Sequence, residues 1–283
     1  MLAATFKNPK LELELNDRGF VVIPGFLPKE DIERLLTLYK TNHAERLIGC
    51  WNSLYDLPVG SGEEISAQIR AVTEPHLDKL FNDWQFPSAL FIVKNPGQNH
   101  ESLVHRDDTM HDENELQYRQ CWVPLVDLTT ENGALYMVPK SHKLFTDSRP
   151  MFAKWPYEHL RPRLEREFHT IYAKAGDLIV YLDKTLHGSY KNTSSDTRPV
   201  FQGGIMHKDA HPLYTRYIAE RNEVEIYEVD PQFFFNKEYM NPVVNPKYPL
   251  IKVEKYTSTE ITEAELDEFF GNPEHNEVEV SIH

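Results

Sequence analysis

The chain has 283 residues, of which 40% are hydrophobic and 12% aromatic, so it can bury a substantial core, and a single domain over residues 1–283 is expected. Its net charge of −14 argues against nucleic acid and anionic membrane surfaces as partners, and no run approaches the ~20 apolar residues that span a bilayer. With only two cysteines and no signal-peptide pattern at its start, the chain is expected in a reducing cytoplasm.

Residues 14–84 are predicted to form one strand and the helices that pad a sheet. The run at residues 19–23 is short, β-branched and stopped by a Pro-Gly pair, as expected of a strand that ends in a turn. A helix begins at Pro28, because apolar residues then recur at helical spacing. A second helical stretch covers residues 63–82, and Pro75 inside it predicts two short helices.

From residue 88 to residue 206 the pattern changes to short strands separated by turn signals. Eight strands are predicted, at residues 88–94, 103–107, 118–127, 134–138, 170–173, 178–181, 187–190 and 198–206. The predicted fold is therefore mainly β with flanking helices, built on a barrel core that is a jelly-roll or cupin-like double-stranded β-helix. Two insertions, at residues 108–116 and 143–167, are candidate lids. The C-terminal extension, residues 207–283, is expected to be a solvated flap with one capped helix at residues 259–270.

An imidazole and a carboxylate stand two residues apart at His105 and Asp107. Side chains alternate across a β-strand, so both project from one face and can share a metal ion. His187 can supply a third ligand, and two histidines with one carboxylate form the facial triad that holds non-haem Fe(II). The pair by itself is a weak signal, because it can arise by chance among thirteen histidines. Arg106 faces the other way and is expected to form an outward salt bridge.

Arg198 follows His187 after a turn-rich stretch that would return the next strand alongside. A planar guanidinium beside a metal can pair with a carboxylate in bidentate fashion, which suits a dicarboxylate co-substrate. An ordinary surface arginine is the alternative. The spacing of His111 and His142 predicts no second metal site, and His142 is expected to make a structural hydrogen bond.

Six further segments lie in order over residues 14–206. They are NDRGFVVIPGF at residues 16–26, VHRD at 104–107, WVPL at 122–125, ENGALYMVPKSH at 131–142, GD at 176–177, and HGS at 187–189 followed by Arg198. This combination resembles the phytanoyl-CoA dioxygenase-like branch of the Fe(II)/2-oxoglutarate-dependent oxygenases. The resemblance implies that His105, Asp107 and His187 bind Fe(II), that Arg198 holds the co-substrate 2-oxoglutarate, and that O2 takes the last position.

By the same resemblance, Ser189 helps to hold the distal carboxylate of 2-oxoglutarate, Trp122 lies beside the co-substrate and Lys94 contacts it. The alternatives are a plain strand serine, a core tryptophan and a solvent-exposed lysine. Tyr118 and Gln120 share the period-two face of Trp122, which would make them lining residues of the cavity.

The reaction implied by the resemblance is hydroxylation of an unactivated C–H bond of a small molecule, with 2-oxoglutarate converted to succinate. Desaturation, epimerisation or cyclisation in natural-product biosynthesis by the same centre is the first alternative. A non-redox cupin-like metal isomerase or a binding protein is the second. The sequence does not determine the substrate, the carbon oxidised, the oligomeric state or the outer partners of the metal ligands.

Carboxylates are dense in the loop that follows the metal-binding pair. They belong to Asp108, Asp112, Glu113 and Glu115. Several carboxylates at one cavity mouth would attract a cation and repel the phosphates of an acyl-CoA thioester, which favours an amine-bearing or amino-acid-derived substrate. The alternative is that they only solvate an outward loop.

Overall fold

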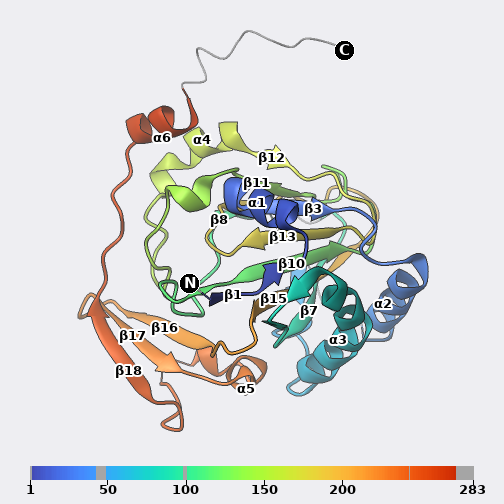
Figure 1. The fold of residues 1–283 in the computed structure, drawn as a ribbon, viewed down its shortest axis with the longest axis horizontal. Helices are drawn as coiled ribbons and strands as arrows, with labels where there is room; N and C mark the ends of the chain where they lie inside the picture. Colours follow the sequence, from blue (N-terminus) through green and yellow to red (C-terminus); the bar gives the residue numbers. More distant parts are fainter. Residues whose placement is uncertain (1, 43–48, 98–100, 242, 272–283) are drawn as a thin grey trace.

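The computed structural model describes residues 2–42, 49–97, 101–241 and 243–271, and its centre is a pair of antiparallel sheets (Figure 1). In the larger sheet the strand order is β3-β13-β10-β15-β7-β4, with β6 paired to β15; in the smaller it is β12-β11-β14-β8. The larger sheet contains β3 (Phe20–Ile23), β4 (Cys50–Asn52), β6 (Trp84–Gln85), β7 (Ala89–Lys94), β10 (Arg119–Pro124), β13 (Leu178–Leu182) and β15 (Arg198–His207). The smaller sheet contains β8 (Ser102–His105), β11 (Leu135–Met137), β12 (His169–Thr170) and β14 (His187–Ser189).

One apolar cluster joins the facing surfaces of the two sheets. Trp122, Ile179 and Val200 of the larger sheet pack with Leu135 and Met137 of the smaller one. The central strands β10 and β13 are buried along their whole length, because a second apolar cluster covers the outer face of the larger sheet. The predicted β-rich jelly-roll fold is thus confirmed.

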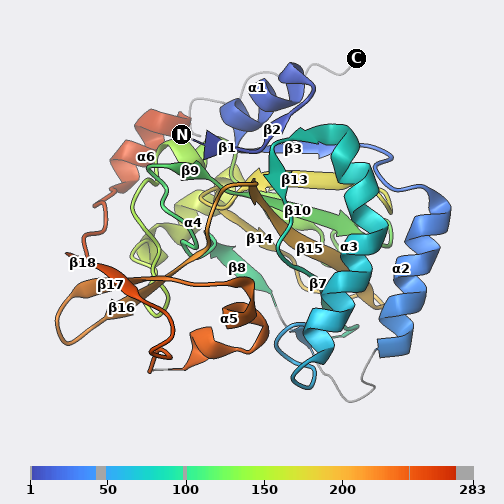
Figure 2. The ribbon, with the colours of Figure 1, turned by 60° about the horizontal axis from the view of Figure 1, so that its bottom comes forward.

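Helices α2 (Lys29–Asn42) and α3 (Ser61–Leu80) cover that outer face near β7 (Figure 2). The prediction of two short helices broken at Pro75 is wrong, because α3 is one helix with the proline inside it. Proline removes one hydrogen bond of the helix, but Ile69 before it and Leu77 after it are both buried against the same sheet. Packing on both sides of the proline keeps the two halves in line.

Helix α1 (Pro9–Arg18) was not predicted. Its leucines alternate with charged residues at period two, so that Leu13 is exposed and Leu15 is buried, and this hides the helical period. The end signals were present in the sequence. Asn8 caps the N-terminus by accepting from the Lys10 N–H, and Gly19 ends the helix in the left-handed conformation with a φ of 87°.

Residues 213–255 are not the solvated flap that the sequence predicted. They form a three-stranded antiparallel sheet of β16 (Leu213–Ile218), β17 (Glu223–Glu228) and β18 (Leu250–Lys255). Helix α5 (Pro231–Phe235) lies between β17 and β18 in the chain. Aromatic side chains of this region bury one another in a cluster around Tyr214 and Phe233. The aromatic residues therefore stabilise a packed unit beside the barrel (Figure 1).

The remaining elements are short. They are β1 (Leu2–Ala3) paired with β9 (Leu116–Gln117), β2 (Thr5–Phe6) paired with β5 (Phe81–Asn82), the 3-10 turns at Ser141–Lys143, Glu158–Leu160, Glu165–Glu167 and Glu238–Met240, α4 (Arg161–Leu164) and α6 (Glu263–Phe270). Helix α6 confirms the predicted capped helix, with a capping box between Thr262 and Glu265. Within the described ranges, every helix is too short or too polar to cross a bilayer.

Candidate metal centre and adjoining cavity

Three side chains with metal-binding chemistry converge at the smaller sheet. His105 ends β8 and His187 begins β14, and the antiparallel register of these strands sets the two residues opposite each other. The Nε2 atoms of His105 and His187 lie 3.8 and 3.5 Å from Oδ1 of Asp107. One possible ligand atom from each residue lies within 4.8 Å of the other two. These three residues could therefore hold one metal ion.

Backbone carbonyl groups orient both imidazole rings. Nδ1 of His105 lies 2.8 Å from the carbonyl oxygen of Leu103, and Nδ1 of His187 lies 2.9 Å from that of Thr185. A carbonyl only accepts, so each Nδ1 carries the ring proton, and the Nε2 lone pair is left for a metal ion. The outer partners that the sequence did not identify are thus backbone groups two residues before each histidine.

The charge state of these groups also fits a metal ion. Burial lowers the pKa of His187 to about 4, so its ring is neutral at neutral pH, as ligation requires. Oδ2 of Asp107 is buried and accepts no hydrogen bond from any residue that the structure describes. A buried carboxylate oxygen without a partner is costly, and a bound cation would satisfy it. Two imidazoles and one carboxylate are the donor set of the non-haem Fe(II) triad, which leaves positions open.

Two buried cations lie together near this centre. Lys94 at the end of β7 pairs in register with Arg198 at the start of β15, and the Lys94 ammonium donates to the backbone carbonyls of Ser189, at 3.0 Å, and of Tyr190. Ser189 is two residues from His187, so β14 links the cations to the metal centre. No ion pair joins Lys94 or Arg198 to a carboxylate among the described residues.

The electrostatics of this pair favour an anionic ligand. Burial lowers the pKa of Arg198 to about 10, and Nε and Nη1 of its guanidinium have no hydrogen-bond partner in the described chain. Burial and the nearby Arg198 charge lower the pKa of Lys94 to about 7. Trp122 is buried beside them, with its ring centroid 5.3 Å from the Arg198 guanidinium carbon. The structure thus places Lys94, Trp122, Ser189 and Arg198 around one buried region of positive electrostatic potential.

A cavity of about 230 Å³ opens beside Asp107. Its walls come from the barrel, from the segment after β8 and from the C-terminal unit, and include Tyr55, Asp107, Asp108, Tyr118, Gln120 and Phe234. The predicted lining role of Tyr118 and Gln120 is confirmed. A Cβ atom added to Gly204 would lie 1.3 Å from the Tyr118 hydroxyl oxygen, so glycine at this position makes room for the ring.

The acidic loop contributes one carboxylate to this cavity rather than four. Asp108 lines it, and burial together with the neighbouring Asp107 charge raises the Asp108 pKa to about 6. Asp112 and Glu115 are exposed, and Glu113 forms an ion pair with Arg149 at 2.8 Å. The expectation of several carboxylates at one mouth is therefore wrong, because the turn after Met110 directs the later ones away.

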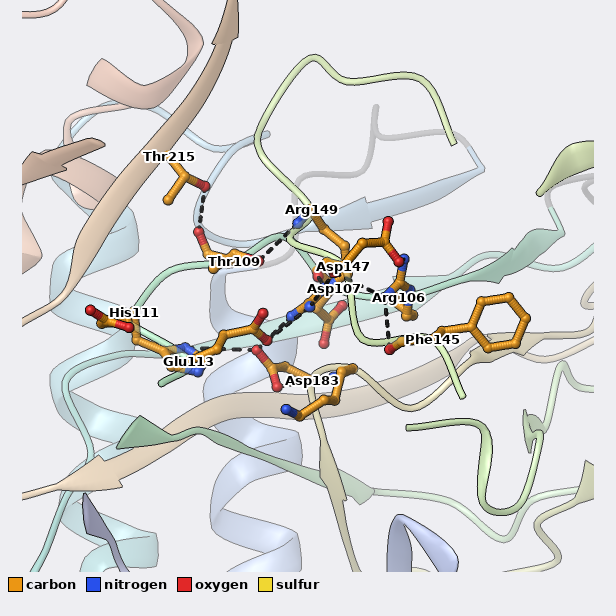
Figure 3. Close-up of polar contacts among 12 residues, drawn as sticks. Arg106, Asp107, Thr109, His111, Glu113, Phe145, Asp147, Arg149, Asp183 and Thr215 are labelled. Carbon is orange, nitrogen blue, oxygen red and sulfur yellow. Dashed lines mark hydrogen bonds and ion pairs between the residues drawn. The ribbon is translucent and has the colours of Figure 1, made fainter. Parts of the chain in front are cut away.

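A buried ionic network behind the metal centre was missed by sequence reasoning (Figure 3). His111, Glu113 and Asp183 offer possible ligand atoms within 4.8 Å of one another, and the Arg149 guanidinium lies among them. His111 and Glu113 stand two residues apart, but Arg149 and Asp183 come from two other segments, so no local spacing could have predicted the whole network. His142 lies elsewhere, with Nε2 3.1 Å from the Asn16 carbonyl, which confirms its predicted structural hydrogen bond.

Arg106 also belongs to this network. Its side chain is buried and pairs with Asp147 at 3.0 Å, so the prediction of an outward salt bridge is wrong about direction. Arg106 follows the end of β8, and its side chain points into the insertion at residues 143–167, where it donates to the carbonyls of Phe145 and Asp147 (Figure 3). This part of the insertion is bound to the metal-ligand segment by buried ion pairs.

Comparison with known proteins agrees with this geometry. The sequence model of the phytanoyl-CoA dioxygenase (PhyH) family matches residues 63–200, which include both metal-binding strands and Arg198. This match, together with those to curated phytanoyl-CoA dioxygenases, supports placing the chain in the phytanoyl-CoA dioxygenase-like family. This family comprises Fe(II)- and 2-oxoglutarate-dependent oxygenases, and His105, Asp107 and His187 lie close enough together to hold one metal ion.

Three relatives describe how far the likeness extends. Phytanoyl-CoA dioxygenase 1 of Oryza sativa subsp. japonica is 30% identical over 113 residues, which are 39% of this chain and 40% of the rice protein, so less than half of that relative is matched. Dioxygenase olcK of Penicillium canescens is 26% identical over 211 residues, 65% of each chain. The non-haem alpha ketoglutarate dependent carbocyclase SnoK from nogalamycin biosynthesis superposes with a TM-score of 0.54 at 19% identity, covering 72% of this chain and 86% of SnoK. The last likeness establishes the fold.

Proposed function

We propose that this protein is an Fe(II)- and 2-oxoglutarate-dependent oxygenase that hydroxylates an unactivated C–H bond of a small, amine-bearing molecule. One observation carries the proposal. The metal-binding triad includes His187 of β14, and on the same strand the Ser189 carbonyl accepts from Lys94, the register partner of Arg198. Among the described residues, neither of these two buried cations forms an ion pair with a carboxylate. A metal triad alone would also fit a non-redox cupin-like isomerase or a binding protein. The adjoining cations favour a metal enzyme that also binds a dicarboxylate.

The residues of the chain would divide the work as follows. His105, Asp107 and His187 would hold Fe(II), with both rings kept in the ligating tautomer by the carbonyl groups behind them. Arg198 and Lys94 would bind the distal carboxylate of 2-oxoglutarate. When bound with O2, this cofactor pair supplies the oxidising chemistry, in which 2-oxoglutarate becomes succinate and CO2 and one oxygen atom enters the substrate.

Trp122 and Ser189 would complete the co-substrate site. The buried Trp122 ring lies against Arg198 and excludes water from its apolar side. A dry wall strengthens the attraction between the guanidinium and a carboxylate. Ser189 is buried on the strand that carries His187, where its hydroxyl could donate to the same carboxylate.

The substrate class follows from the cavity beside Asp107. Among the described residues that line it, Asp108 is the one carboxylate besides Asp107, and the aromatic rings of Tyr55 and Phe234 form other parts of the wall. A carboxylate with aromatic faces suits a cationic amine. A volume of about 230 Å³ favours a small molecule, such as an amino acid or a derivative, over an acyl-CoA thioester.

The centre is tested by adding 2-oxoglutarate to the anaerobic Fe(II) protein. A visible metal-to-ligand charge-transfer band, followed by succinate formation in air, is expected. No band together with no succinate would favour the isomerase or binding-protein alternative. The substrate class is tested separately, by comparing succinate formation with amines, amino acids, neutral lipids and acyl-CoA thioesters. Turnover of an acyl-CoA with none for any amine would overturn the amine assignment.

A second reaction type deserves the same assay, because SnoK, with a similar fold, is named as a carbocyclase. Desaturation, epimerisation and cyclisation use the same iron site and co-substrate as hydroxylation. The mass of the product distinguishes them: hydroxylation adds one oxygen atom, desaturation and oxidative cyclisation each remove two hydrogens, and epimerisation leaves the mass unchanged. A product with one added oxygen is expected here.

A further inference from the structure

The insertion at residues 143–167 and the metal-ligand segment hold each other through two arginines (Figure 3). From the metal-ligand segment, Arg106 donates to the Phe145 carbonyl at 3.0 Å, to the Asp147 carbonyl at 3.1 Å and to the Asp147 carboxylate at 3.0 Å. From the insertion, Arg149 reaches back to the metal-ligand segment.

Arg149 makes the contact nearest to the metal centre. Its Nε donates to the backbone carbonyl of Asp107 at 2.6 Å, and its Nη2 donates to the Asp183 carboxylate at 3.0 Å. Its backbone forms a pair of hydrogen bonds with Thr109, in which Arg149 N–H donates to Oγ1 at 3.0 Å and Thr109 N–H donates to the Arg149 carbonyl at 2.9 Å. One side chain thus joins the insertion to the segment after β8 and to the turn between β13 and β14.

Asp183 completes the restraint on the metal ligand. The Asp183 carbonyl accepts from the Asp107 N–H at 3.0 Å, while its carboxylate accepts from Arg149. Both polar groups of the Asp107 backbone are therefore fixed, the N–H by Asp183 and the carbonyl by Arg149. Asp107 lies beyond the end of β8, so the sheet ladder itself does not fix the carboxylate that would bind the metal.

A second metal ion is a poor explanation for the cluster of His111, Glu113 and Asp183. Arg149 already pairs with both carboxylates, at 2.8 and 3.0 Å. Burial acts to lower the Arg149 pKa, but these two carboxylates outweigh it and raise that pKa. A divalent ion here would lie against a guanidinium in a site with little water to screen the repulsion. The guanidinium is the cation of this cluster.

We propose that Arg149 is a positioning residue that holds the Asp107 carboxylate in its metal-binding place. The inference deepens the proposed function, because it rests on His105, Asp107 and His187 being the metal site. Without the Nε–H of Arg149, the Asp107 carbonyl loses its restraint, and the buried Asp183 and Glu113 carboxylates repel each other. The segment after β8 would then shift, and the three ligand atoms would no longer converge. Loss of an outer partner of this kind typically weakens metal binding about 10- to 100-fold.

The test uses Co(II) as a probe of the triad in the full-length protein, without 2-oxoglutarate or turnover. The variants are Arg149→Met and Arg149→Lys. The matched control is Arg163→Met, since Arg163 lies in the same insertion, is also buried and also pairs with two carboxylates, those of Glu167 and Asp267, but contacts no residue of the metal segment. Three quantities are measured: the Co(II) dissociation constant, the visible d–d spectrum, which reports the ligand geometry, and the unfolding temperature of the metal-free protein.

Wild-type protein and Arg163→Met are expected to bind one Co(II) with the same affinity and spectrum. Arg149→Met is expected to bind at least about tenfold more weakly with a changed spectrum, even where both Met variants lower the unfolding temperature alike. Arg149→Lys keeps the charge but not the planar fork, so an intermediate affinity is expected, and this variant decides the question if Arg149→Met does not fold.

Three outcomes would overturn the proposal. They are an unchanged Co(II) affinity and spectrum in the Arg149 variants, an equal loss of affinity in Arg163→Met, or a second Co(II) equivalent in wild-type protein that His111→Ala removes. If wild-type protein binds a single Co(II) and the His187→Ala variant binds it equally well, the metal triad is contradicted, and with it the proposed function.

Discussion

Two buried arginines near the metal centre differ in nearly every respect. Arg149 pairs with Glu113 and Asp183 and donates to the Asp107 carbonyl, and its pKa is raised despite burial. Arg198 has two guanidinium nitrogens without a partner in the described chain, and burial lowers its pKa to about 10. Removing one partner of a paired buried charge leaves the other uncompensated and destabilises the fold, whereas a buried charge without a partner indicates a missing ligand. By this criterion Arg149 belongs to the architecture, and Arg198 fits the co-substrate site that we propose.

The largest effect is expected at the metal centre near both arginines. His187→Ala removes the better buried of the two imidazoles and should reduce substrate-dependent succinate formation below detection. The fold should persist, because barrel packing does not depend on the ion. Iron content and circular dichroism of the purified variant check both statements. Near-native turnover with full iron content would contradict the triad.

Exchanging each arginine for methionine tests the contrast directly. Arg149→Met leaves two buried carboxylates uncompensated, so it should reduce the free energy of unfolding by about 3–5 kcal/mol. Arg198→Met removes an unpaired buried charge and should leave the stability of the ligand-free protein unchanged or raise it. The same variant should raise the KM for 2-oxoglutarate tenfold or more, because a charge-assisted hydrogen bond contributes about 1.5–3 kcal/mol.

Urea unfolding of the ligand-free proteins and 2-oxoglutarate titrations measure these quantities, with Fe(II) affinity as the control for Arg198→Met. Equal destabilisation by both substitutions would contradict the distinction between a satisfied and an unsatisfied arginine. Wild-type dependence of Arg198→Met on 2-oxoglutarate would place the carboxylate site elsewhere.

A half-buried carboxylate, that of Asp108, extends the comparison to the substrate. Asp108 lines the cavity, while Asp112 is exposed outside it. Asp108→Asn should raise the KM for an amine substrate about tenfold, since one charge-assisted hydrogen bond is weakened. Asp112→Asn is the matched control and should change the KM by less than about twofold, because an exposed carboxylate is screened by salt. Equal effects of the two substitutions would instead indicate that several loop carboxylates act together at the mouth of the cavity.

The smallest effect concerns Lys94, whose pKa is lowered to about 7. An anion binds the charged ammonium better than the neutral amine, so the dissociation constant of 2-oxoglutarate should rise about threefold between pH 6.5 and pH 7.5, as for one group titrating at its midpoint. Lys94→Met should bind more weakly and lose this slope. Calorimetric titration at several pH values measures it, and a flat profile in wild-type protein would contradict a role for Lys94.

The same pKa has an opposite consequence for the ligand-free fold. The unfolded lysine keeps its proton up to its ordinary pKa of 10.5, whereas the folded one releases it near pH 7. Between these values the unfolded state binds more protons, so this group makes the fold more stable as pH rises from about 7 towards 10. Lys94→Met should remove that dependence from the pH profile of unfolding.

The sequence alone determined the features that depend on local spacing. A spacing of two residues predicted that His105 and Asp107 point the same way, and the two side chains do lie together although β8 ends at His105. The order of the family motifs added His187 and Arg198. The jelly-roll followed from the eight short strands. The capped helix near residue 262 followed from a pattern of four residues.

Only the tertiary structure decided the features that depend on contacts between distant segments. Pro75 continues a helix because both halves pack on one sheet, and the aromatic C-terminal region forms a unit because its side chains bury one another. Arg149 contacts residues that are 34 to 42 positions away in the chain. That Nε and Nη1 of Arg198 lack a hydrogen-bond partner among the described residues is seen only in the folded chain. Burial and pairing of charges are properties of the packed chain, so no local pattern could have predicted which arginine was satisfied and which was not.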